Sequence, residues 1–147
     1  MPTRRDLIVG AGAMALVPAR AAATPELRDR EIARLTGGAP VANDGRVTLT
    51  IPAVAENGLS VFTTVSIASP MTPDDHVRRI HILAERNPIS RLLTWQLSPT
   101  CGVAKVSTNI RLAASQSVPA LVEMSDGSFS QDRKTVVVTI AACIDGG

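Results

Sequence analysis

Apolar and polar residues alternate with a period of two along most of the chain, which is the pattern of strands buried on one face. The segment Leu59–Ile67 shows this clearly, with Leu, Val, Thr, Val and Ile at every second position. Turn residues such as Asn43-Asp44-Gly45 and Ser125–Ser128 separate the alternating segments. The predicted strands cover residues 47–51, 59–67, 77–84, 92–97, 103–112, 118–124 and 135–140.

About seven short strands at this spacing predict an all-β fold, an immunoglobulin-like antiparallel β-sandwich. The Cys-Trp-Cys order of true immunoglobulin domains does not fit, because Trp95 precedes both cysteines. A chain of 147 residues is long enough for one domain and too short for two. We therefore expect one folded domain, over residues 24–140.

A different pattern opens this domain. Thr24-Pro25-Glu26 has the order of a helix N-cap, a proline in the first helical position and an acid in the first turn. Leu27, Ile32 and Leu35 then fall on one apolar arc, and Gly37-Gly38 is a typical helix end. The sequence thus predicts one short amphipathic helix, residues 25–36, before the sandwich.

Residues 1–23 have the features of a twin-arginine signal peptide. Arg4-Arg5 lies in a positively charged start, the apolar stretch Leu7–Val17 follows, and the small residues Ala21 and Ala23 suit cleavage after Ala23. The apolar stretch is shorter than the roughly 20 residues of a membrane-spanning helix. We expect export of the folded protein to the bacterial periplasm, where thiols tend to oxidise.

Composition narrows the classes of function. Hydrophobic residues make up 45% of the chain but aromatic residues only 2%, so the core must be aliphatic. The aromatic stacking platforms of single-strand nucleic-acid binding are therefore missing. The net charge is +2, and the arginines of the leader account for it, so the mature chain is near neutral. We expect neither nucleic acid nor, after cleavage of the leader, a membrane as partner.

Signatures of enzymes and metal sites are weak. The sequence has no glycine-rich phosphate loop and no cysteine pair at metal-ligand spacing. A mononuclear site built from His76 with Asp74 or Asp75 is one interpretation, and a loop histidine bonded to backbone is the favoured one. His81, between two isoleucines, is best explained as a structural histidine. The sequence predicts no catalytic residues, no metal and no cofactor.

The chain ends in a segment of unusual chemistry. After the β-branched run before Ile140 comes an arm, residues 141–147, that contains Cys143. Its other residues are Ala141, Ala142, Ile144, Asp145, Gly146 and Gly147. An exposed thiol in an oxidising compartment calls for an explanation. One is a disulfide between Cys101 and Cys143, and the other is a covalent carrier whose arm brings Cys143 into enzyme active sites, over a reach of about 10 Å from Ile140.

A series of short motifs runs from Ile51 nearly to the end of the chain: Ile51-Pro52, Ala55–Gly58, Ser69–Thr72, Asp75–Val77, Ile80-His81, Ala84–Pro88, Ser107–Ala113, Glu123–Ser128 and Val138–Ile140. No single motif is specific, but their joint order is specific when combined with the leader and the near-terminal cysteine. On these residues the chain resembles SoxY, the sulfur-carrier subunit of the bacterial thiosulfate-oxidising Sox system.

This resemblance implies an immunoglobulin-like sandwich that pairs with a second small β-sandwich, SoxZ. It also implies that Cys143 is joined to thiosulfate by a haem enzyme, SoxXA. A hydrolase, SoxB, then releases sulfate, and a dehydrogenase, SoxCD, oxidises the remaining sulfane sulfur. The carrier itself is no catalyst and needs no cofactor.

The tail departs from the family pattern, which reads Thr-Ile-Gly-Gly-Cys-Gly-Gly. Here Ala141-Ala142 replaces the first glycine pair, and Ile144-Asp145 is inserted after Cys143. Ile144 widens the arm beside the thiol, and the carboxylate of Asp145 disfavours the thiolate. An alternative interpretation is therefore a SoxY-like binding subunit that does not carry sulfur covalently.

Overall fold

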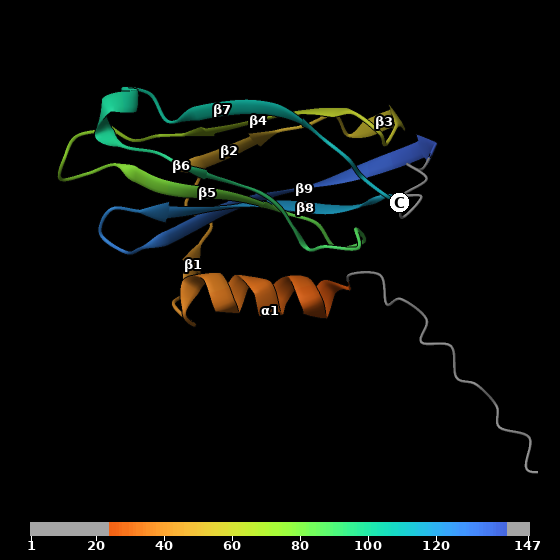
Figure 1. Ribbon diagram of the computed structural model, residues 1–147, viewed down its shortest axis with the longest axis horizontal. Coiled ribbons are helices and arrows are strands. Elements are labelled where there is room, and N and C mark those ends of the chain that lie inside the picture. The colour runs from red at the N-terminus through yellow and green to blue at the C-terminus, as the bar shows by residue number, and fades with distance from the viewer. Residues whose placement is uncertain (1–23, 141–147) are drawn as a thin grey trace, which may run out of the picture.

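The structure, a computed structural model, describes residues 24–140 and consists of two β-sheets packed face to face with one helix outside them (Figure 1). The helices are α1 (Pro25–Thr36) and a short 3-10 helix, η1 (Pro99–Cys101). The strands are β1 (Val41–Ala42), β2 (Val47–Thr50), β3 (Val54–Asn57), β4 (Val61–Ile67), β5 (Val77–Leu83), β6 (Arg91–Gln96), β7 (Lys105–Ile110), β8 (Gln116–Met124) and β9 (Phe129–Ile140).

The larger sheet has the strand order β1-β9-β8-β5-β6, with β3 also paired to β9, and the smaller sheet has the order β2-β4-β7. This confirms the predicted all-β sandwich with its N-terminal helix. Two details differ from the expectation. Residues 24–140 form nine strands where about seven were predicted, and β1 and β3 pair with β9 in parallel, so the sandwich is not purely antiparallel.

The core between the sheets is aliphatic, as the composition predicts. Strand β4 alternates buried and exposed or half-buried residues along its seven positions, and its inward residues meet those of β5 and β8. Phe62 is exposed and Trp95 only half-buried, so aromatic rings contribute little. Fully buried aliphatic residues in this core include Leu49, Val65, Val77, Ile80, Ile82, Leu112, Val118, Val122 and Val136.

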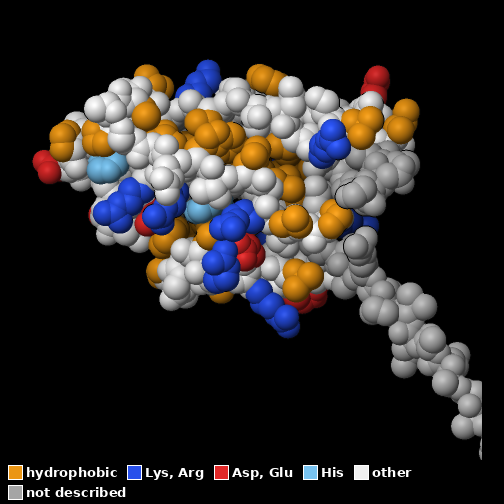
Figure 2. Space-filling view, viewed as in Figure 1, with side chains coloured by type: hydrophobic (Ala, Val, Ile, Leu, Met, Phe, Trp, Pro, Cys, Tyr) orange, Lys and Arg blue, Asp and Glu red, His pale blue; other side chains and the backbone are white. Residues whose placement is uncertain are grey.

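The two long sides of the sandwich are closed differently. On the β2 side, the Leu49 backbone N–H donates to the Asp132 carboxylate of β9 across the two sheets, at 2.9 Å. On the other side the edge strands β6 and β7 leave half-buried side chains between the sheets, among them Leu92, Trp95 and Val106. Figure 2 shows hydrophobic side chains running along the middle of this face. We call this the open seam.

Helix α1 packs on the outer face of the larger sheet. The Thr24 hydroxyl accepts from the Leu27 N–H at its start, and Gly37, with φ 62°, ends it in the left-handed region that glycine tolerates. Ile32 and Leu35 contact a small second cluster of Leu83, Leu121 and Phe129. The helix predicted over 25–36 is thus confirmed, with its predicted caps.

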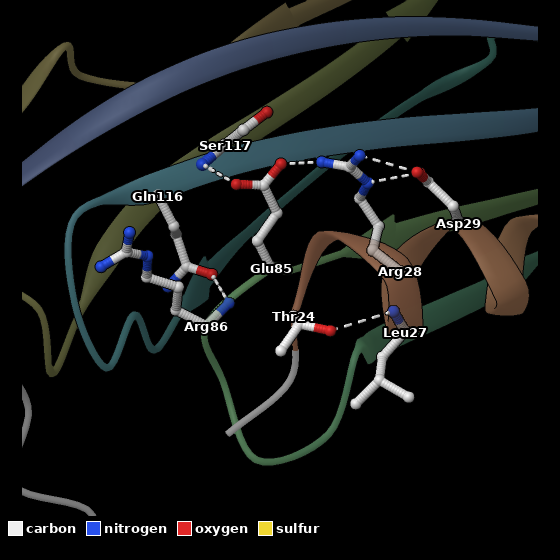
Figure 3. A network of polar contacts seen from close by, with 8 residues as sticks. All are labelled: Thr24, Leu27, Arg28, Asp29, Glu85, Arg86, Gln116 and Ser117. Atoms are coloured by element: carbon white, nitrogen blue, oxygen red, sulfur yellow. Dashed lines mark hydrogen bonds and ion pairs between the residues drawn. The ribbon is translucent and has the colours of Figure 1, made fainter. Parts of the chain in front are cut away.

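A buried ion pair fastens the first turn of α1 to the sheet (Figure 3). The Arg28 residue is only 6% exposed, and its guanidinium meets the Glu85 carboxylate just after β5. Glu85 also accepts from the Ser117 N–H at 3.3 Å, while Arg28 donates to the exposed Asp29 at 2.9 Å. Because both charges are mostly withdrawn from water, removing one leaves the other without compensation.

We therefore expect Glu85→Gln to lower the free energy of unfolding by about 3 kcal/mol, since Arg28 would keep its buried charge. Asp29→Asn serves as the matched control, because this carboxylate is 61% exposed and such pairs contribute less than about 1 kcal/mol. Urea unfolding at neutral pH measures both variants. Equal effects of the two substitutions would contradict the assignment of Glu85 as the anchor of the helix.

Candidate functional site

The chain leaves the folded domain at Ile140, and this point is the candidate functional site. Cys143 and the arm residues Ala141, Ala142, Ile144, Asp145, Gly146 and Gly147 lie outside the described residues. Ile140 is the last described residue and ends β9. The structure therefore determines where the arm begins and what surrounds its attachment.

Strand β9 is held on its β8 edge until close to its end. Antiparallel pairing with β8 runs from Glu123 opposite Phe129 to Gln116 opposite Val136. Beyond the ladder, the Val138 N–H donates to the Ser115 hydroxyl at 2.8 Å. A side-chain hydrogen bond thus extends the β8 contact of β9 beyond the end of the backbone ladder.

The opposite edge of β9 is held by β3 as far as Ile140. Parallel pairing places Asn57 opposite Ile140, and the Gly58 N–H donates to the Ile140 carbonyl at 3.0 Å. The Thr139 hydroxyl donates to the Glu56 carbonyl at 3.0 Å. Strand β3 thus begins its pairing where the β8 ladder ends at Val136, and its contacts fix the attachment point of the arm relative to the core.

Exposed apolar side chains lie around this attachment point. Val54 is 58% exposed and Val137 is 48% exposed, and the two are register partners. Ile140 is 66% exposed, and Leu59, which follows the Gly58 contact, is 46% exposed. We call Val54, Leu59, Val137 and Ile140 the root surface. The strand β3 that completes it was not among the predicted strands, because Val54–Asn57 has only four residues and lies between Pro52 and Gly58.

The root surface matters because the arm is short. Three residues from Ile140 to Cys143 span at most about 10 Å. A protein that acts on the Cys143 thiol must bring its active site within that distance of Ile140. The root surface therefore has to lie at or near the contact with any such protein.

Cys101, the other cysteine, is a free, exposed thiol at the end of η1. In Figure 1, the short helix η1 between β6 and β7 lies at the opposite end of the sandwich from the end of β9. Gln96, shortly before η1, is level across β5 and β8 with Phe129, the first residue of β9.

The length of β9 separates the two ends of the sandwich by about 35 Å. A disulfide needs Cα atoms within about 7 Å, and the reach of the arm adds only about 10 Å. The pairing of Cys101 with Cys143 involves a residue outside the described part of the chain. Within one chain, this geometry disfavours it.

His76 forms its hydrogen bonds with backbone and side-chain atoms of the neighbouring loops. Its Nδ1 lies 3.1 Å from the Thr72 carbonyl, and its backbone N–H donates to the Ser125 hydroxyl at 3.0 Å. Asp75 closes the same turn by donating its N–H to the Thr72 hydroxyl, and the Asp74 carbonyl accepts from Ser125. These contacts match the interpretation of His76 as a loop histidine bonded to backbone. Residues 24–140 contain no group of three or more His, Cys, Asp or Glu arranged to hold a metal ion.

His81 is buried, and its Nδ1 lies 2.9 Å from the Thr94 hydroxyl on β6. Burial, and then the nearby Arg91 guanidinium, lower the pKa of His81 below its usual value. The folded sheet therefore favours the neutral form of the His81 side chain, which agrees with a structural role.

Comparisons with known proteins agree on family and fold. The family described as "Sulfur oxidation protein SoxY" matches residues 32–143, roughly three quarters of the chain. The solved structure of the sulfur carrier protein SoxY from Chlorobium limicola f thiosulfatophilum superposes with a TM-score of 0.63 and 24% identity. The alignment covers 75% of this chain and 90% of that one. No curated protein matches the chain.

Superoxide reductases share the same fold. The enzyme from Ignicoccus hospitalis has a TM-score of 0.56 and 16% identity, over 80% of this chain and 94% of its own. The one from Nanoarchaeum equitans has a TM-score of 0.52 and 10% identity, over 66% and 98%. At such identities the likeness concerns the fold alone, and one fold supports unrelated functions. None of the helices in residues 24–140 has the length and apolar character needed to cross a bilayer.

The lowered pKa of His81 gives stability a pH dependence. The unfolded chain, with an ordinary histidine pKa near 6.5, binds this proton more readily than the folded chain. Stability contributed by the neutral His81 is thus present above about pH 6.5 and lost as the pH falls below it. We expect His81→Gln to reduce the loss of unfolding free energy between about pH 7.5 and about pH 5.5. Denaturant titrations at both pH values measure it, and an unchanged loss would contradict the assignment.

Proposed function

Because the chain belongs to the SoxY family, we propose that it is a sulfur carrier that holds thiosulfate-derived intermediates covalently on Cys143. The observation that carries the proposal is the fixed end of β9, which presents a short cysteine-bearing arm at one end of the sandwich. The family match runs through residue 143 and so includes this cysteine. The Chlorobium protein of the same fold is itself described as a sulfur carrier.

In the loading step, the Cys143 thiolate and the outer sulfur of thiosulfate form an S–S bond. Two electrons leave the pair and pass to a haem enzyme of the SoxXA type. In the product, the cysteine sulfur is bonded to the outer sulfur of thiosulfate, which carries the sulfonate group with its one negative charge. Thiolate chemistry of this kind needs an accessible sulfur, which a short arm beyond the last strand provides.

Unloading proceeds in stages. A hydrolase of the SoxB type uses water to cleave the bond to the sulfonate, which releases sulfate with two protons and leaves a persulfide on Cys143. A dehydrogenase of the SoxCD type then oxidises the remaining sulfane sulfur to a sulfonate, which takes three oxygen atoms from water and passes six electrons, with release of six protons, to the dehydrogenase. A second hydrolysis then releases sulfate and returns the free thiol. The carrier contributes the sulfur atom and the docking surface, and these enzymes contribute the catalysis.

The proposal includes a SoxZ-like partner, with which the chain forms a heterodimer, and transient docking of the Sox enzymes at the root surface. It also includes twin-arginine export, which places the carrier in the periplasm with residues 1–23 removed. In that oxidising compartment the carrier requires a Cys143 that is not bridged within the chain. The distance between Cys101 and the end of β9 supports this requirement.

We expect incubation with thiosulfate and the loading enzyme to add one S₂O₃ unit to the chain, located on Cys143 and removed by a thiol reductant. Cys143→Ser should abolish this adduct, and Cys101→Ser, the matched control, should retain it. Intact-protein and peptide mass spectrometry measure both. An unmodified Cys143 in the presence of an active loading enzyme would contradict covalent carriage. Growth on thiosulfate unaffected by Cys143→Ser would favour the binding-subunit alternative.

The root surface gives a second expectation. Val137→Lys places a charge beside the arm, and we expect it to lower the loading rate per enzyme about tenfold, since a charge in an apolar contact costs on the order of 1–2 kcal/mol. Val103→Lys is the control, because Val103 is also exposed, at 68%, but lies near η1 at the far end. Loading rates at limiting carrier concentration measure the difference. Equal rates for the two variants would remove the root surface from the docking contact.

A further inference from the structure

A groove opens at the end of the open seam where β6 begins and β7 ends. It has a volume of about 270 Å³ and is lined by Asn87, Pro88, Ile89, Leu92 and Arg111. A second hollow, of about 210 Å³, shares three of these residues and extends along β7 as far as Asn109. We call the two together the seam groove.

The seam groove lies close to the attachment point of the arm. The Leu112 N–H donates to the Gly58 carbonyl at 2.8 Å, and the Gly58 N–H donates to the Ile140 carbonyl at 3.0 Å. Through this single glycine, the backbones of Leu112 and Ile140 come within about 10 Å of each other. Arg111, the residue before Leu112, therefore lies within reach of the first residues of the arm.

The groove has an apolar wall and one charge. Pro88, Ile89 and Leu92 form the apolar part, and Ile89 is 71% exposed. Arg111 is the charged residue among those that line either hollow, and it forms no salt bridge with any residue in 24–140. A ligand with an apolar group next to an anionic group would be complementary to this groove.

The floor of the groove is rigid. Asn87 is only 4% exposed and donates from its amide to the Arg111 carbonyl at 2.7 Å. Its side-chain oxygen accepts from the Ala113 N–H at 3.1 Å and from the Gln116 amide at 2.8 Å. With all these bonds made inside the protein, Asn87 fixes the backbone of Arg111 relative to the turn that carries Ile89.

We propose that the seam groove binds the chain's own C-terminal arm, with Ile144 against Ile89 and Leu92 and the Asp145 carboxylate beside the Arg111 guanidinium. The arm supplies one apolar and one acidic residue, and the groove supplies an apolar wall and one cation to meet them. Ile144 and Asp145 lie four and five residues beyond Ile140, which allows reaches of about 13 and 17 Å. Both residues are insertions relative to the tail that the family resemblance implies, so the groove gives them a shared purpose.

This docking deepens the proposed function and rests on it for its purpose. With the arm in the groove, Cys143 is held beside the domain, and Arg111 offsets the repulsion between the Asp145 carboxylate and the thiolate. An enzyme that contacts the root surface competes with the groove for the arm. The resting carrier would thus expose its sulfur less than the engaged carrier.

Disulfide trapping tests the docking without any sulfur chemistry. In the intact chain carrying Cys101→Ser and Cys143→Ser, the substitutions Ile89→Cys and Ile144→Cys place one thiol on the groove and one on the arm. The control pairs Ile144→Cys with Phe62→Cys. Phe62 is 60% exposed and is the register partner of Asn109, so it lies near the same end but beside the second hollow, whose lining does not include Ile89.

On mild oxidation, with any co-purifying subunit present, we expect an intrachain disulfide in the Ile89–Ile144 pair at least about tenfold faster than in the Phe62–Ile144 pair. Adding Arg111→Gln should slow the first reaction several-fold, and Lys105→Gln, at the other end of β7, should not. Peptide mapping under non-reducing conditions identifies the bond.

Equal rates for the two cysteine pairs, or insensitivity to Arg111→Gln, would overturn the proposal. A disulfide formed mainly between two chains would overturn it in favour of a second copy in the groove. Failure here and failure of the proposed function remain distinguishable. If the chain loads thiosulfate but does not cross-link, only the docking of the arm in the groove is contradicted. If it cross-links but does not load thiosulfate, only the carrier role is contradicted.

Discussion

The pairing of β9 on both of its edges is the constraint on which the site depends. Strand β8 holds it along one edge and β3 along the other, up to the contact between Gly58 and Ile140. A terminal strand without a partner frays easily, whereas β9 has β3 as partner over Val137–Ile140, directly after the β8 ladder ends at Val136. The position of the arm is therefore set by the sheet, and the root surface and the seam groove acquire fixed places around it.

The sequence predicted the elements whose signals are local. The alternation around Leu59–Ile67 and the caps of α1 depend on neighbouring residues alone, and both were confirmed. The first half of β9 was missed because the run after Phe129 is polar. Its polar groups are used by distant partners: Ser130 donates to Asp44, and Asp132 accepts from the Leu49 N–H. Partners more than 80 residues away leave no periodic trace in the sequence.

The candidate site also has one part that the sequence alone could indicate and another part that depends on contacts between distant segments. Cys143 could be singled out from its place near the end of the chain and from the family resemblance. The root surface and the seam groove could not, since Val54, Arg111 and Ile140 come together only through the pairing of β3 with β9 and through Gly58. The unpaired sides of β6 and β7 depend on the order of strands in two sheets, which no single segment specifies.

The distance between Cys101 in η1 and the end of β9 has a consequence for redox behaviour. Cys101 is free and exposed on η1, a strand's length away from the arm. Because Cys143 lies only three residues beyond Ile140, this distance disfavours an internal dithiol couple between the two sulfurs, which would act as a two-electron store within the chain. A disulfide between Cys101 and Cys143 would instead join two chains, and it would be detected as a doubling of the molecular mass.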